Sequence, residues 1–170
     1  MIQDPDRRGR ALAKLFREIE PRLYADLEEA GVLPEQREAA GQAQALREWE
    51  CFALYACVRG LVAAGGFNRE TAGAIDALHE AVLAGWRAEE HEGETLEARR
   101  QLIAERYAEY GAIGQAGGKS GAATVTQRLG EAAARHMTAP AEAPPELGEL
   151  AGTLHESLAE GAAEAVRREE

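Results

Sequence analysis

Apolar residues recur at steps of three and four along most of this chain, and that spacing is the strongest constraint on its fold. The clearest series lies near the start and consists of Leu12, Leu15, Phe16, Ile19, Leu23 and Leu27. Residues at these steps share one face of an α-helix. Because no run of alternating apolar and polar residues predicts a strand, we expect an all-α protein.

Composition supports a helical bundle. Apolar residues make up 45% of the chain but aromatic residues only 5%, so the core must consist mainly of alanine, leucine and valine. Such small side chains suit closely packed helices. A chain of 170 residues is long enough to bury a core of its own. We therefore expect one domain of about five to six helices.

Prolines and glycines predict where the first two helices begin and end. The first should run from Pro5 to Gly31, and Pro21 should kink or divide it because proline lacks an amide donor. The second should run over about 34–64. Its second half is apolar on nearly every side, which predicts a long apolar helix at the centre of the bundle or one half covered by a partner chain.

The remaining chain predicts further helices and a tethered tail. The expected helices are 69–86, capped by Asn68, then 95–113, and one from Ser120 to about His136. Residues 139–147 are rich in proline and alanine and should form a semi-rigid linker. We therefore divide the chain into a bundle core (1–138), the linker (139–147) and a C-terminal amphipathic helix (148–170). That helix should dock on the bundle or on a second protomer.

The stretch GQAGGKSGAATV, residues 114–125, has the appearance of a phosphate-binding loop. A P-loop requires a glycine at the position that Ile113 occupies, and it follows a buried strand rather than a helix. We therefore expect the glycines to end one helix and turn the chain, with Ser120 capping the next helix. A weak anion site at Lys119 and Ser120 is the most that this stretch predicts.

The charge of the chain disfavours several partners. A net charge of -11 opposes binding to nucleic acid and to anionic membrane surfaces. A helix-turn-helix drawn through 117–136, with Lys119, Arg128 and Arg135 as its basic residues, is the weakest interpretation for that reason. We expect neither a nucleic-acid partner nor a membrane.

Several features favour a bacterial cytoplasmic protein without a cofactor. No apolar stretch follows the first ten residues, so we expect no secretory signal. Arginine greatly outnumbers lysine, which indicates a GC-rich and therefore bacterial genome. Cys51 and Cys57 would lie about 120° apart on one helix, so they cannot bridge each other, and no zinc-ligand spacing is present. Asp76 and His79 have the spacing of two metal ligands, but a di-iron bundle needs two Glu-x-x-His pairs and two more glutamates. We expect neither a metal nor a cofactor.

Polar residues on apolar faces are the candidate binding residues. Arg59 is the only charge in the most apolar segment, so it must pair, reach the surface or face a ligand. We expect Asp76 on the next helix to be its partner. His79 lies on the core face of the expected third helix, and its ordinary role there is a hydrogen bond within the bundle.

A second set of candidates lies on the expected fourth helix. Tyr107 and Tyr110 should point inward there, flanked by Arg106. Buried tyrosines are usually satisfied by their neighbours, which makes a polar core layer the plainer interpretation. If all six residues converge in the bundle centre, they form a ligand pocket. This candidate site comprises Arg59, Asp76, His79, Arg106, Tyr107 and Tyr110.

Two functional hypotheses follow. The first is a non-enzymatic protein-interaction module, homodimeric through the surplus apolar surface of its second helix. The second is a helical bundle that binds or acts on a small anionic ligand through Arg59, His79, Arg106 and Tyr107. No nucleophile motif supports catalysis, so the sequence favours a non-enzymatic protein over an enzyme.

Overall fold

The computed structural model describes residues 1–35, 38–88, 95–117 and 122–168. Its helices are α1 (Pro5–Glu29), α2 (Ala39–Gly65), α3 (Arg69–Ala88), α4 (Leu96–Gly117), α5 (Ala122–Thr138) and α6 (Pro145–Arg167). No strand occurs in these four ranges. The expected all-α bundle of five to six helices is confirmed.

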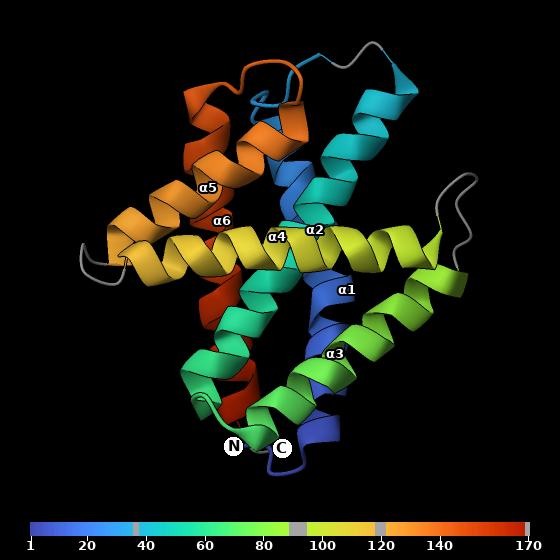
Figure 1. Ribbon diagram of the computed structural model, residues 1–170, viewed down its shortest axis with the longest axis vertical. Helices are drawn as coiled ribbons and strands as arrows, with labels where there is room; N and C mark the ends of the chain where they lie inside the picture. The colour runs from blue at the N-terminus through green and yellow to red at the C-terminus, as the bar shows by residue number, and fades with distance from the viewer. Residues whose placement is uncertain (36–37, 89–94, 118–121, 169–170) are drawn as a thin grey trace.

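The helices are arranged around α2, which contacts each of the other five (Figure 1). The closest pairings are α1 with α3, α2 with α6, and α5 with α6. In contrast, α4 lies across the front of the molecule, roughly at right angles to its long axis (Figure 1). The two ends of the chain lie side by side at the lower end, where the amide of Ile2 donates to the carbonyl oxygen of Val166 at 3.0 Å.

The first helix begins as predicted but continues through its proline. Asp4 caps it, because its carboxylate accepts hydrogen bonds from the amides of Asp6 at 2.8 Å and Arg7 at 3.2 Å. The expectation that Pro21 would divide this helix is wrong. Pro21 is exposed, while Phe16 and Leu27 on either side of it are buried. Packing of the apolar stripe on both sides therefore outweighs the one missing hydrogen bond.

The second helix begins later than the sequence predicts, at Ala39 rather than Pro34. Val32 and Leu33 pack against the core just after Gly31, whose φ is 69°. The chain therefore bends over the end of α1 before a new helix can begin. The end of α2 agrees with the prediction, because Gly66 follows with a φ of 76°.

The glycine-rich stretch differs from its prediction. Gly114 and Gly117 do not turn the chain, because α4 continues to Gly117. A methyl group at position 117 would overlap the side chain of Val125 on α5. Glycine is needed there for close contact between two helices rather than for a turn. Lys119 and Ser120, the predicted anion site, lie outside the described residues.

The last helix, α6, packs against other helices of its own chain. It begins at Pro145, three residues before the predicted start at 148, and it lies against α1, α2 and α5. Its contact with α5 is close because Gly130 faces Gly148 and Gly152. Leu147 and Leu158 are buried on its inner face.

Candidate functional site

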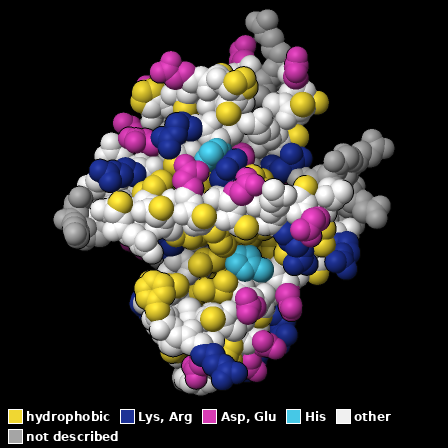
Figure 2. Space-filling model, viewed as in Figure 1, with side chains coloured by type: hydrophobic (Ala, Val, Ile, Leu, Met, Phe, Trp, Pro, Cys, Tyr) yellow, Lys and Arg dark blue, Asp and Glu magenta, His cyan; other side chains and the backbone are white. Residues whose placement is uncertain are grey.

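A large, mainly apolar groove lies open between α2 and α4 and also reaches α5. We call it the α2–α4 groove; its volume is about 650 Å³. The lining residues are mostly apolar or glycine, and they are Tyr55, Val58, Arg59, Val62, Ala63, Phe67, Gly111, Gly114, Gln115, Gly117 and Val125. Hydrophobic side chains gather on the face of the molecule just below α4 (Figure 2). A hollow of this size and lining is typical of a binding site.

The sequence explains why the groove is hollow. Gly111, Gly114 and Gly117 follow one another at steps of three on α4, so the side of this helix that faces the groove carries few side chains. Val58 and Val62, one turn apart on α2, form part of the opposite wall. At the rim, Phe67 is 93% exposed. An aromatic side chain so exposed beside an apolar groove is a common feature of contact surfaces.

Arg59 lines this groove, and its guanidinium is already paired with a carboxylate of a neighbouring helix. Its guanidinium lies 2.9 Å from the carboxylate of Glu156 on α6. The hydroxyl of Thr126 donates to the same carboxylate oxygen at 2.9 Å. The expected ion pair with Asp76 is therefore wrong; Asp76 is exposed on α3. The sequence does not show which helices are neighbours, and here α6 rather than α3 lies beside Arg59.

Tyr55 connects the groove to His79 and Tyr107. The rings of Tyr55 and Tyr107 are 5.0 Å apart, and the Tyr107 hydroxyl lies 2.8 Å from Nε2 of His79. Burial lowers the pKa of His79, although Asp76 and a hydrogen bond with the backbone of Ile75 oppose this shift. Burial also raises the pKa of Tyr107 well above its usual value. At neutral pH the hydroxyl therefore donates to a neutral imidazole, and neither group is an activated nucleophile.

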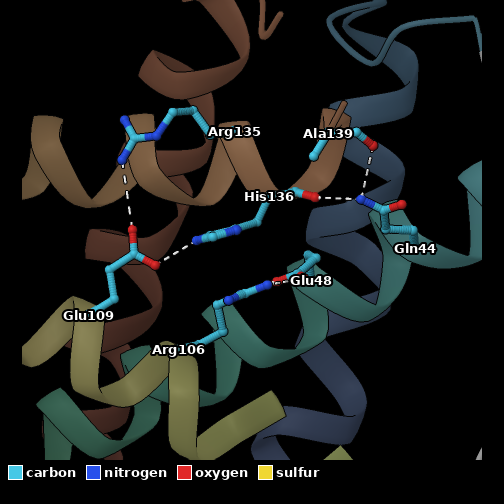
Figure 3. A network of polar contacts seen from close by, with 7 residues as sticks. All are labelled: Gln44, Glu48, Arg106, Glu109, Arg135, His136 and Ala139. Carbon is cyan, nitrogen blue, oxygen red and sulfur yellow. Dashed lines mark hydrogen bonds and ion pairs between the residues drawn. The ribbon is translucent and has the colours of Figure 1, made fainter. Parts of the chain in front are cut away.

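Arg106 belongs to a separate contact on the other side of α4. Its Nε and one terminal nitrogen each lie 2.8 Å from an oxygen of Glu48 on α2 (Figure 3). Such a two-point pair is the strongest geometry for a guanidinium and a carboxylate. The Glu48 side chain is only 7% exposed. Arg106 therefore joins α4 to α2.

The same region links α4 to α5. Glu109 lies between two residues of α5, with one carboxylate oxygen 2.5 Å from Nε2 of His136 and the other 3.7 Å from Arg135. The side-chain amide of Gln44 on α2 donates to the carbonyl oxygens of His136 at 2.9 Å and Ala139 at 3.1 Å, at the end of α5 (Figure 3). These contacts hold three helices together, which is a structural role.

Tyr110 and His155 are the most deeply buried polar side chains of this region. The Tyr110 hydroxyl makes no hydrogen bond with any described residue. His155 on α6 is fully buried, stacks on Phe52 at 4.0 Å and shares a hydrogen bond of 3.0 Å between its Nδ1 and the carbonyl oxygen of Phe52. Its Nε2 likewise has no partner in the described ranges. Burial, together with the nearby charge of Arg59, lowers the pKa of His155 to about 3.

His155 was missed by the sequence reasoning. Its place on the apolar face of α6, between Ala151 and Leu158, was the available signal.

The six predicted site residues thus occupy different surroundings. Arg59 lines the groove. His79 and Tyr107 lie next to it, because Tyr107 contacts the lining residue Tyr55. Arg106 takes part in the contacts that join α4 to α2, and Tyr110 is buried beside Phe52. Asp76 is exposed.

Comparisons with other proteins add no functional information. No protein-family model, no curated protein and no solved structure matches this chain. Within the described ranges, no three His, Cys, Asp or Glu side chains are grouped so as to hold a metal ion. None of the described helices combines the length and apolarity that a membrane span requires. Any functional proposal therefore rests on the geometry of this chain.

Proposed function

We propose that the protein is a non-enzymatic interaction module that forms a homodimer through the α2–α4 groove. The observation that carries this proposal is the exposure of Phe67, 93%, at the rim of an apolar hollow of about 650 Å³. Burying a phenylalanine side chain is worth about 1.5–3 kcal/mol. A second copy that covers this face gains that free energy twice.

The groove is self-complementary. A projecting side chain, Phe67, and a hollow that can receive it lie on the same face. A two-fold rotation places the Phe67 of each copy at the groove of the other, which is the geometry of an isologous interface.

The charge of the groove lining also supports homodimer formation. The chain has a net charge of -11, yet no carboxylate belongs to a described lining residue of this groove. Two copies therefore meet here with the least repulsion.

The test is the mass of the full-length chain by light scattering at two concentrations, with Phe67→Ser as the variant. We expect a dimer that dissociates on dilution, and a folded monomer for Phe67→Ser with the helical content of the wild type. Leu46→Ser is the matched control, because Leu46 is an exposed apolar residue of α2 outside this groove. A wild-type monomer at both concentrations, or a Phe67→Ser dimer as stable as the wild type, rejects the proposal.

A small anionic ligand is the second candidate, and the position of Arg59 in the groove wall favours it. An apolar chain ending in a carboxylate matches a hollow with valine walls, and its carboxylate would take the place of Glu156 beside the Arg59 guanidinium. The probe is octanoate, with acetate as its comparison. Under this alternative, octanoate raises the melting temperature of a monomer and Arg59→Met removes the effect.

We also propose a cytoplasmic location. Support comes from Cys51 and Cys57, which are both buried and unpaired, as is usual in a reducing compartment. Burial raises the pKa of each thiol to about 12, so neither is a reactive thiolate.

A further inference from the structure

His155 carries an unused hydrogen-bond acceptor behind the wall of the α2–α4 groove. Its Nδ1 lies 3.0 Å from the carbonyl oxygen of Phe52, and a carbonyl oxygen only accepts hydrogen bonds. The His155 ring is neutral at neutral pH, since its pKa is about 3. The single proton of the neutral ring is therefore on Nδ1, and the lone pair on Nε2 needs a donor.

No described residue supplies that donor. Nε2 of His155 makes no hydrogen bond within the described ranges, although the side chain is fully buried. A buried polar atom without a partner costs free energy, and such atoms are rare in folded proteins. A bound molecule that donates a hydrogen bond to Nε2 removes this cost.

Two residues of the groove lining adjoin His155. The ring of Tyr55 lies 6.1 Å from the His155 ring, and the charge of Arg59 is close enough to lower the pKa of His155. Tyr55 and Arg59 lie one turn apart on α2, and both line the groove, whose volume is about 650 Å³. The buried acceptor therefore lies directly behind this part of the groove wall.

Tyr55 is the part of this wall that has room to move. It is half-buried, and its hydroxyl makes no hydrogen bond with a described residue. The hydroxyl faces Gly111 on α4, where an added methyl group would lie 4.0 Å away. At Gly114, the next residue of the glycine face, nothing lies within 4 Å of such a group. The Tyr55 ring can therefore turn toward α4 and uncover His155.

These surroundings define the class of molecule that fits. The Tyr55 ring packs against the rings of Tyr107 at 5.0 Å and Tyr110 at 5.4 Å. A flat ring that takes its place restores both contacts. An N–H or O–H group on that ring supplies the donor that Nε2 of His155 lacks. A cation is disfavoured by the charge of Arg59, and a carboxylate has no hydrogen to donate.

We propose that the α2–α4 groove opens into a binding site for a small neutral aromatic molecule, which donates a hydrogen bond from an N–H or O–H group to Nε2 of His155. The bound ring takes the place of the Tyr55 ring, which turns toward Gly111 and Gly114. The site lies within one copy of the chain, so it goes beyond the proposed homodimer and does not depend on it.

The test uses the full-length protein, with indole as the probe and 1-methylindole as its comparison. The two molecules have nearly the same shape, but only indole has an N–H group. Isothermal titration calorimetry should show indole binding at least about tenfold more tightly, because only indole satisfies the buried acceptor. Equal affinities would mean that the groove takes flat apolar rings without using His155, and this result would overturn the proposal. So would a failure of indole to bind at about 5 mM.

A variant and a spectrum locate the hydrogen bond. In His155→Phe the preference for indole should disappear, because phenylalanine cannot accept. It should persist in His136→Phe, the matched control, since His136 contacts Glu109 and lies outside the groove lining. In nitrogen NMR of the wild type, the Nε2 signal of His155 should shift on addition of indole but not of 1-methylindole. A preference that survives in His155→Phe, or an Nε2 signal that indole leaves unchanged, overturns the proposal.

Discussion

At the scale of single residues, two side chains that look alike in the sequence can differ in whether their hydroxyl groups make hydrogen bonds. Tyr107 and Tyr110 lie one turn apart on α4, yet only Tyr107 has a recorded hydrogen bond, to His79 at 2.8 Å. A buried hydroxyl that makes no hydrogen bond costs free energy, and one that is satisfied contributes about 1 kcal/mol.

Removing the two hydroxyls should therefore affect stability differently. Tyr107→Phe is expected to lower the free energy of unfolding by about 1–2 kcal/mol, because it leaves Nε2 of His79 without its donor. Tyr110→Phe should leave stability unchanged or raise it slightly. Urea unfolding of the two variants gives the comparison, and an equal loss for both would contradict this account.

His155 should make the protein sensitive to acid. Its pKa is about 3 in the folded chain and 6.5 as the reference value for an unfolded one. Between these values the unfolded state binds more protons, so stability is full above about pH 6.5 and falls as the pH falls toward about 3. The largest slope from one such group is about 1.4 kcal/mol per pH unit.

The check is the free energy of unfolding measured from about pH 7 down to about pH 4, in the wild type and in His155→Phe. Phenylalanine keeps a ring to stack on Phe52 but cannot bind a proton. The variant should therefore lose less stability per pH unit than the wild type. Parallel pH profiles would show that His155 is not the group responsible.

At the scale of elements, the α5–α6 pair depends on residues without side chains. A methyl group at Gly130 would overlap the carbonyl oxygen of Gly148 and lie 2.9 Å from the amide nitrogen of Gly152. Backbone atoms of two helices cannot move apart without loosening the buried leucines beside them.

Gly130→Ala should therefore destabilise the protein by about 2 kcal/mol or more, even though alanine is the better helix former. Gly161→Ala on α6 is the matched control, because nothing lies within 4 Å of the added methyl group. That control should raise stability by up to about 1 kcal/mol. Differential scanning calorimetry of both variants measures the contrast, and two shifts of the same sign would disprove it.

At the scale of the whole molecule, α4 is attached differently from the other helices. It lies across the bundle (Figure 1), and among its described residues Tyr110 is the only large side chain that is fully buried. Elsewhere it is held by the ion pairs of Arg99 with Glu50 and of Arg106 with Glu48, and by a hydrogen bond between Glu109 and His136. A helix held mainly by polar contacts opens more readily than one with a broad apolar face.

Hydrogen exchange should detect this difference. The amides of α4 are expected to exchange faster than those of α2, and Glu48→Gln should speed α4 exchange by about tenfold because Arg106 loses its charged partner. Glu105→Gln is the control, since Glu105 is an exposed α4 carboxylate whose one hydrogen bond among the described residues comes from Gln101 on the same helix. Equal protection of α4 and α2 would show that α4 is as firmly held as the core.

Local features of this protein follow from the sequence alone. The helix stripes, the caps at Asp4 and Asn68, and the end of α2 at Gly65 depend on residues within a few positions of one another. The same local reasoning predicted that Arg59 needs a partner and that Tyr107 lies against the core. It failed at Pro21 and at Gly114–Gly117, where packing between helices outweighs the local preference for a break.

Only the tertiary structure decided which residues meet. Arg59 pairs with Glu156, 97 positions away, and Arg106 pairs with Glu48, 58 positions away. Such contacts depend on the order and crossing of helices, which a periodic pattern of small apolar residues does not specify. For the same reason, the α2–α4 groove exists because the glycine face of α4 happens to cross the valines of α2. The sequence determined the helices and their apolar faces, and the packing of those faces determined where this protein has surface left to bind.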